Sequence, residues 1–131
     1  MGTVSGTSIS FGTAVVYNSA ITNHNSIAFD PNTAGKFVVA YRDYGNSHYN
    51  TVNVGTVSGT AISFSGESVV NTGNTQYNSI SFDPNTAGKF IVAYKDLGNS
   101  NYGNAIVCQL EVITTSLTST NFVGITAEAI T

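Results

Sequence analysis

The sequence predicts an all-β protein, and three features support this prediction. Charged residues make up 8% of the 131 residues, against roughly 25% in typical soluble domains. Serine, threonine, asparagine and glycine supply the polarity instead, and all four are unfavourable inside helices. Short apolar or alternating segments are separated by glycine- and asparagine-containing turns, and this whole arrangement occurs twice. Strands and turns are therefore expected throughout the chain.

The repeat is close to identical over long stretches. Residues 2–7, GTVSGT, return as residues 55–60, and residues 29–37, FDPNTAGKF, return unchanged as residues 82–90. A fixed offset of this kind is typical of repeat architectures. Since the same turns and apolar positions recur in the same order, both copies are expected to adopt the same local fold.

Each copy is expected to contain four strands. In the first copy they cover residues 25–30, 36–43, 49–57 and 61–70, separated by the turn sequences DPNTAG, DYGNS and SGT. The second strand, KFVVAY, and its copy KFIVAY are apolar on both faces, as expected for an inner strand that neighbouring blades cover on either side. The fourth is more polar, as expected for an edge. Four antiparallel strands in about 50 residues, repeated head to tail, predict blades of a β-propeller.

The phase of the repeat predicts how the chain is divided. Residues 1–17 are expected to form the closing outer strand of a blade, residues 18–70 a complete blade, residues 71–112 three strands of a second blade, and residues 113–131 a tail outside the repeat. An extra fourth strand at one end complements a missing one at the other. Propellers have four to eight blades, so head-to-tail self-association is expected, with a trimer giving six blades. A fragment of a longer repeat protein is the alternative, and it is compatible with assembly.

The repeated motifs GTVSGTxISF, NSIxFDPN and VAY[R/K]DxGNS resemble the blade repeats of large structural and tail-fibre proteins of marine bacteriophages. The resemblance covers residues 2–112. Residues 121–130, NFVGITAEAI, are similar to the start of a module that follows such repeats in fibre-like proteins. The resemblance implies a virion-associated or extracellular protein with a surface-binding role, and it brings no catalytic residues.

Aromatic and amide side chains concentrate around one turn of each copy. Carbohydrate binding typically combines an aromatic face with hydrogen bonds from amides or carboxylates. The candidate ligand-binding residues are Tyr44, Asn46, His48 and Tyr49 in the first copy and Asn99, Asn101 and Tyr102 in the second, with Tyr41 and Tyr94 nearby in the sequence. The alternative interpretation is that these tyrosines are structural.

The same turns begin with Asp43 and Asp96, each followed by Gly-Asn-Ser after one residue. This arrangement has two explanations: weak calcium or sugar binding, or an aspartate that bonds its own backbone, which is preferred. The turns loosely resemble the aspartate boxes of sialidase-like propellers, without their tryptophan.

Other polar residues favour structural roles. His24 and His48 are not kept in the second copy, so a metal site on each blade is not supported. Arg42 and Lys95 occupy equivalent positions and are expected either to line a central channel in a trimer or to pair with the adjacent aspartates. Cys108 is expected to be a small apolar residue on a strand.

Composition argues against several functions. A formal net charge of -3 with four Lys and Arg residues leaves no basic stripe for nucleic acid. No apolar run approaches the roughly 18 residues needed to span a membrane, and the first residues lack the pattern of a secretory signal. No nucleophile and base occur at motif spacing, so catalysis and a cofactor are not expected.

We therefore predict a non-catalytic propeller module that recognises a surface or carbohydrate, with weak sites multiplied around a ring. A purely structural spacer is the alternative prediction. A fragment of a sialidase-like glycoside hydrolase is the least favoured.

Overall fold

The computed structural model describes residues 2–111, and these residues are all-β, as predicted. The strands are β1 (Gly2–Ser5), β2 (Ser8–Phe11), β3 (Thr22–Phe29), β4 (Lys36–Asp43), β5 (Tyr49–Ser58), β6 (Ala61–Phe82), β7 (Lys89–Asp96) and β8 (Tyr102–Gln109). A short 3-10 turn, η1 (Tyr44–Asn46), follows β4. The tail predicted at residues 113–131 lies outside the described residues.

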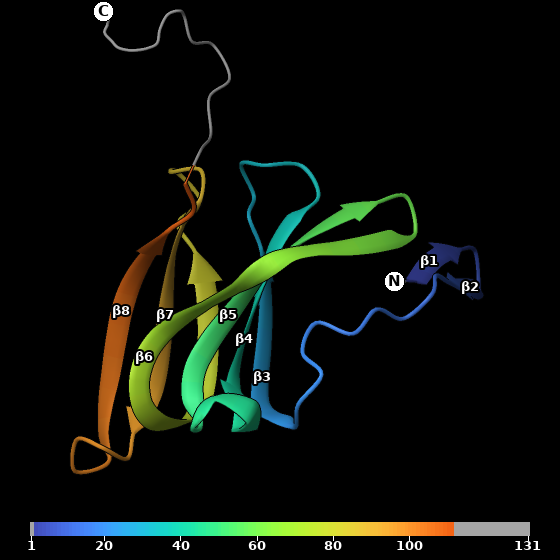
Figure 1. The fold of residues 1–131 in the computed structure, drawn as a ribbon. Coiled ribbons are helices and arrows are strands. Elements are labelled where there is room, and N and C mark those ends of the chain that lie inside the picture. Colours follow the sequence, from blue (N-terminus) through green and yellow to red (C-terminus); the bar gives the residue numbers. More distant parts are fainter. Residues whose placement is uncertain (1, 112–131) are drawn as a thin grey trace, which may run out of the picture.

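Strands β3 to β8 form one antiparallel sheet in sequence order, and β1 and β2 form a separate hairpin. The sheet is strongly curled, so that the half that contains β4 and β5 faces the half that contains the end of β6 and β7. The hairpin stands to one side (Figure 1). Strand β6 makes the curl: its first part pairs with β5, and from Thr75 onward it pairs with β7. Within residues 2–111, strand β8 pairs only with β7 and is an edge of the described sheet.

The two sequence copies correspond to two structural units, which we name unit 1 (residues 18–70) and unit 2 (residues 71–111). The four strands expected in unit 1 are present. The fourth does not stop at residue 70, however, because β6 continues to Phe82 and supplies the first strand of unit 2. The first strand also begins before residue 25, at Thr22, with an irregularity in register between Asn23 and Ser26.

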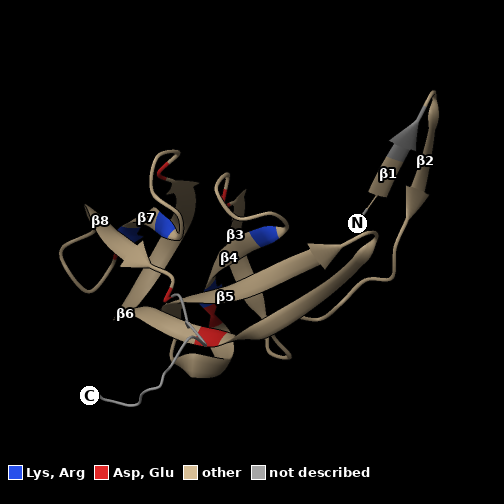
Figure 2. Cartoon of the chain, turned by 90° about the horizontal axis from the view of Figure 1, so that it is seen from above, with Lys and Arg blue, Asp and Glu red and all other residues tan. Residues whose placement is uncertain are grey.

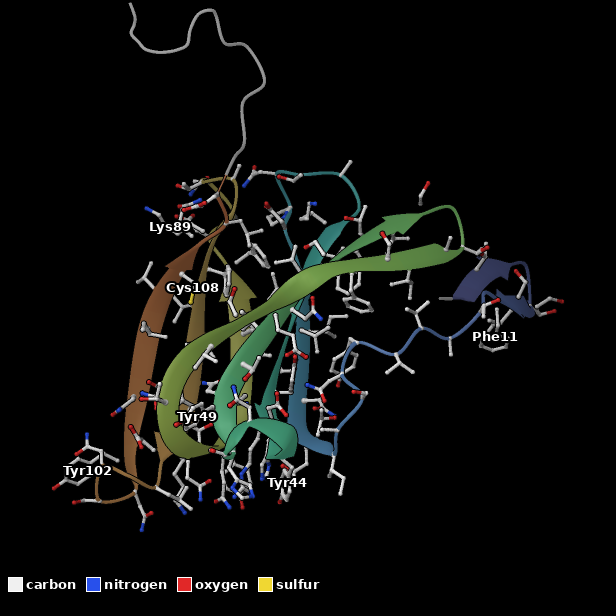
Figure 3. All side chains as sticks on the ribbon, viewed as in Figure 1. Phe11, Tyr44, Tyr49, Lys89, Tyr102 and Cys108 are labelled. Carbon is white, nitrogen blue, oxygen red and sulfur yellow. The ribbon has the colours of Figure 1, made fainter. Side chains whose placement is uncertain are left out.

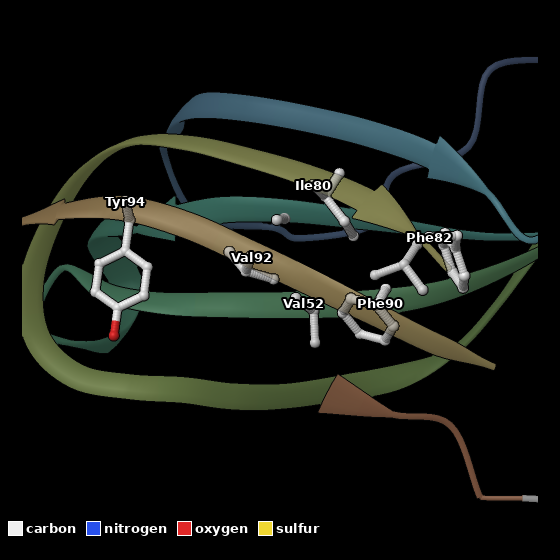
Figure 4. Close-up of a cluster of buried hydrophobic side chains, with 8 residues drawn as sticks. Val52, Ile80, Phe82, Phe90, Val92 and Tyr94 are labelled. Atoms are coloured by element: carbon white, nitrogen blue, oxygen red, sulfur yellow. The ribbon is translucent and has the colours of Figure 1, made fainter. Parts of the chain in front are cut away.

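The main core lies between the two units. Val38, Ala40 and Val52 form what we call the inner face of unit 1. The inner face of unit 2 packs against it and consists of Ile80, Phe82, Phe90, Val92 and Tyr94 (Figure 4). Cys108 packs against this cluster and is half-buried, as expected for a small apolar strand residue.

Each unit also has an outer face, on the other side of its strands. In unit 1 this face carries Phe37, Val39 and Tyr41, which Tyr17, Val57, Ile62 and Phe64 cover, together with Ile27 and Phe29, which are exposed. In unit 2 the outer face carries Ile91, Ala93, Ala105 and Val107, all exposed. Apolar side chains therefore point outward from both ends of the two-unit stack.

The predicted inner strand behaves differently in the two copies. Strand β4 is buried along nearly its whole length, as its two apolar faces predict. Its copy, β7, is buried only at alternate positions within a single chain. The reason is that unit 2 covers the inner face of unit 1, whereas no described segment covers the outer face of unit 2.

Loops at one end of the units are joined by hydrogen bonds. The buried Asp30 carboxylate accepts from the backbone amide of Asn32 (2.9 Å) and from that of Gly88 in unit 2 (2.9 Å). The Asn32 side chain donates to the carbonyl oxygen of Pro84 (3.0 Å). Gly88 has a φ of +76°, which a residue with a Cβ rarely adopts. The loop pair thus fixes how the units are stacked.

The inter-unit bond of Asp30 gives a stability prediction with an internal control. We expect Asp30→Ala to lower the free energy of unfolding by about 2 kcal/mol, since it leaves the buried Gly88 amide without an acceptor. Among the described residues, the carboxylate of its copy, Asp83, accepts only from the exposed Asn85 backbone amide, so Asp83→Ala should cost under about 1 kcal/mol. Urea denaturation measures both, and equal losses would contradict the inter-unit role of Asp30.

The same carboxylate makes stability depend on pH. Burial acts to raise the pKa of Asp30, but hydrogen bonds from Asn32, Thr33 and Gly88 outweigh it and hold the pKa below its ordinary value of 3.8. The contribution of Asp30 to the free energy of unfolding is therefore fully present above its ordinary pKa of 3.8. It is lost as the pH falls through the lower pKa of the folded state. Thermal melts over this acidic range should show a shallower loss of stability for Asp30→Asn than for the natural chain.

Candidate functional site

The sequence-predicted ligand residues lie at one end of the sheet, which we call the turn end. It contains η1 and the turn between β7 and β8. Figure 3 shows Tyr44 and Tyr102 at this end, away from Lys89 and Phe11. The two turns are built alike, because Ser47 and His48 in unit 1 and Ser100 and Asn101 in unit 2 all have φ values near +60°.

In unit 1, Tyr44 is the centre of a contact network. Its ring meets that of His48 edge-on at 4.5 Å between centroids. The Arg42 guanidinium lies 4.8 Å from the Tyr44 ring centroid and donates a hydrogen bond to its hydroxyl (3.1 Å). The Asn23 amide donates to the same hydroxyl (3.2 Å). The structure thus brings Tyr44 and His48 together, with one side of Tyr44 still exposed.

The other two candidates of unit 1 are less central. Asn46 ends η1 and is exposed. Tyr49 is half-buried at the start of β5, opposite Asp43 in β4 and Asn74 in β6. Asn46 is available to a ligand, whereas Tyr49 has limited open surface.

In unit 2 the candidates form an open surface. Tyr102 is 62% exposed, and its backbone amide donates to the carbonyl of Asn99 (2.9 Å). Asn99 and Asn101 are also exposed. Leu97 stands where unit 1 has Tyr44, so the aromatic and histidine network of unit 1 has no counterpart here. No hydrogen bond or ring contact among the described residues joins the two turns.

The aspartates of these turns accept hydrogen bonds from the backbone of their own turns, which is the interpretation that the sequence favoured. The Asp43 carboxylate accepts from the Gly45 amide (2.8 Å), and the Asp96 carboxylate accepts from the Gly98 amide (2.9 Å). The second oxygens are also engaged, by Asn18 (3.0 Å) and Asn104 (3.1 Å) respectively. Within residues 2–111 no cluster of three His, Cys, Asp or Glu side chains is placed to hold a metal ion.

Three residues beside the candidates in the sequence make their contacts elsewhere. Tyr41 and Tyr94 belong to the core and not to the turn surface, since both are buried in phase with the apolar residues of their strands. Burial accordingly raises the pKa of Tyr41 far above its ordinary value. Arg42 does not pair with Asp43, because adjacent strand residues point to opposite faces. Its guanidinium Nη2 instead donates a hydrogen bond to the side-chain oxygen of Asn74 (2.8 Å).

The sequence reasoning missed several residues at the turn end. His24 and Tyr77 are repeat partners with φ values of 54° and 57°, and their rings lie 4.7 Å apart across the two units. Tyr77 is exposed, and the Lys95 ammonium lies 6.0 Å from its ring centroid. Alignment of the two copies could have shown that His24 and Tyr77 occupy equivalent positions. It could not have shown that the stacking of the units makes them neighbours.

Buried amides also lie between the units. Asn50 and Asn78 are buried, and their side-chain atoms have no hydrogen-bond partner among the described residues. Because Asn78 has an exposed copy, Asn25, its burial follows from the stacking and could not be predicted from the motif.

A groove of about 750 Å³ lies at the opposite end of the sheet, with Lys36, Glu67, Gln109 and Glu111 among its lining residues. None of the seven candidate residues lines it, and it contains no aromatic side chain. Charged positions elsewhere are few and scattered over the ribbon (Figure 2). The aromatic and amide chemistry is therefore at the turn end.

Fold and site together define a curled antiparallel β-sheet module of two stacked repeat units, with exposed tyrosine and asparagine side chains at one end. Comparison with known proteins found no match among family models, curated proteins or solved structures. Among residues 2–111 there is no helix of the length and apolarity that crossing a membrane requires.

Proposed function

We propose that this chain is a non-catalytic β-propeller-type binding module, associated with a virion or tail fibre, that recognises carbohydrate through its turn end. The observation that carries the proposal is the grouping of exposed tyrosine rings and side-chain amides at one end. Aromatic faces stack on the apolar side of a sugar ring, and amides pair with its hydroxyl groups. The curled antiparallel sheet is compatible with propeller blades.

Unit 2 supplies the more open part of the proposed site. Tyr102 presents its ring to solvent, with Asn99 and Asn101 in the same turn. Tyr77 adds a second exposed ring at this end, beside Lys95. Each site of this kind is shallow, so binding gains strength when several copies of the chain present it together.

A structural role without a ligand is the second candidate function. One observation favours it: the Tyr44 hydroxyl already accepts hydrogen bonds from Arg42 and Asn23. The Tyr44 hydroxyl is therefore satisfied without a ligand, although Asn23 Oδ1 and Arg42 Nε have no hydrogen-bond partner among the described residues.

The test is an array of neutral and acidic oligosaccharides, followed by titration of the best binder in solution. We expect Tyr102→Ala to weaken binding about tenfold, equivalent to about 1.4 kcal/mol, as loss of a stacking ring predicts. Thr7→Ala is the control, since Thr7 is an exposed turn residue of the β1–β2 hairpin, which stands to one side of the sheet (Figure 1). No binding across the array by a folded chain would favour the structural role.

A further inference from the structure

Identical residues of the two units differ in burial, and the difference follows one pattern. Ile27 is 59% exposed and its copy Ile80 is 8% exposed; Phe29 is 52% exposed and its copy Phe82 is 9% exposed. Register is the same in both units, because Phe29 pairs with Phe37 as Phe82 pairs with Phe90. The side chains are thus equivalent, and only the neighbour differs.

The reverse pattern holds on the other side of the units. Val38 and Ala40 are fully buried on the inner face of unit 1, whereas their copies Ile91 and Ala93 are exposed on the outer face of unit 2. Val107, the copy of Val54, is 62% exposed on the same face. This face is an apolar sheet surface of the kind that unit 2 covers within the chain.

The interface between units is therefore heterologous. It joins one kind of face on unit 1 to the opposite kind on unit 2. One copy of each kind lies at an end of the stack: the outer face of unit 2 is open, and the outer face of unit 1 is open at Ile27 and Phe29. An interface of this type can repeat from molecule to molecule, giving a closed ring or an open array.

We propose that the outer face of unit 2 binds the outer face of unit 1 in a second copy of this chain, repeating the contact seen between the units. Ile27 and Phe29 of one copy then contact Ile91 and Val107 of the next. The centre of the outer face of unit 1 is already covered within the chain, so the contact is made at Ile27 and Phe29, which are exposed. Tyr17 and Val57 flank Phe37 and Tyr41 as their copies Val70 and Leu110 flank the inter-unit core.

The loops extend the same complementarity. Within the chain, Asp30 accepts from the Gly88 amide, and Asn32 donates to Pro84. The side chains of their copies, Asp83 and Asn85, make no inter-unit hydrogen bond among the described residues. In the assembly Asp83 accepts from the Gly35 amide of the next copy.

The edge strand β8 offers a further part of the proposed contact between copies. Strand β5 pairs with the first part of β6, but among residues 2–111 no strand pairs with that side of its copy, β8. The copy of residues 61–64 is β2, whose Phe11 is highly exposed, whereas Phe64 packs against the outer face of unit 1. Because β2 already pairs with β1, it is residues 12–17 of one copy, which are in no strand of the described chain, that add to β8 of another. Three copies would make a ring of six units, within the four to eight of known propellers.

Sedimentation velocity on the full 131-residue chain tests the proposal across micromolar to millimolar concentrations. We expect an oligomer, with three copies as the closed form, that either Ile27→Asp or Val107→Asp converts to monomer. A charge buried in an apolar interface without a partner opposes association strongly. Thr7→Asp is the control, because Thr7 and its copy Thr60 are both exposed turn residues.

Mixing the two variants separates this arrangement from other assemblies. Each variant keeps one intact face, and the two intact faces are complementary, so the mixture should form a one-to-one pair and stop there. Unfolded variants cannot form this pair, so pairing also shows that both are folded. A natural chain that is monomeric at every concentration, or variants that fail to pair on mixing, would overturn the proposal.

Assembly and the proposed ligand site can fail independently. Val107→Asp removes assembly without changing the turn end, and Tyr102→Ala changes the turn end alone. Loss of oligosaccharide binding with intact assembly, or the reverse, therefore identifies which proposal has failed.

Discussion

Phe82→Ala is expected to lower the free energy of unfolding by about 3–5 kcal/mol, the usual cost of removing a buried phenylalanine ring. Phe82 is buried between the units, and its ring centroid lies 5.1 Å from that of Phe90. The truncated side chain would leave a cavity at the centre of the inter-unit core, lined by residues of both units.

The matched control is Phe29→Ala, which removes the identical residue at the same register position of unit 1. Phe29 is half-exposed, so its loss should cost no more than about 1–2 kcal/mol. Urea denaturation in a Val107→Asp background measures both changes without a contribution from self-association. Similar losses for the two variants would mean that the units do not stack as described.

Gly55→Val is expected to cost about 3 kcal/mol or more, at the upper end of overpacking effects. Gly55 is buried in β5, directly opposite Phe37 in β4. A Cβ atom at this position would lie 2.2 Å from Cζ of the Phe37 ring, well inside van der Waals contact. The ring cannot easily move away, because Phe29 and Phe64 also pack against it.

Gly103→Val serves as the control for this substitution. Gly103 lies in β8 and is exposed, and a Cβ atom added to it would have no described neighbour within 4 Å. Its replacement should change stability by no more than about 0.5 kcal/mol, since valine suits a strand. The comparison is made by the same denaturation measurement. A tolerated valine at position 55 would show that Phe37 does not pack over this glycine.

The candidate site was predictable in part. The turn residues Asp43 and Asp96 carry their hydrogen-bonding partners in the local sequence, so their backbone bonds could be anticipated. Burial of Tyr41 and Tyr94 was also available from strand alternation, because both are in phase with the preceding apolar residues. The partners of Arg42 could not be predicted, since Asn74 reaches it from another strand, 32 residues away in the chain.

The repeat by itself determined the all-β fold, the turns and the alternation of faces within each strand. These properties depend on short-range sequence, and so both copies share them. Burial was decided only by the tertiary structure. Ile27 and Ile80, or Phe29 and Phe82, occupy the same place in the same motif, yet one of each pair is covered and the other is not. Burial depends on what packs against a face, and the local sequence of a repeat is the same whether or not a neighbour is present.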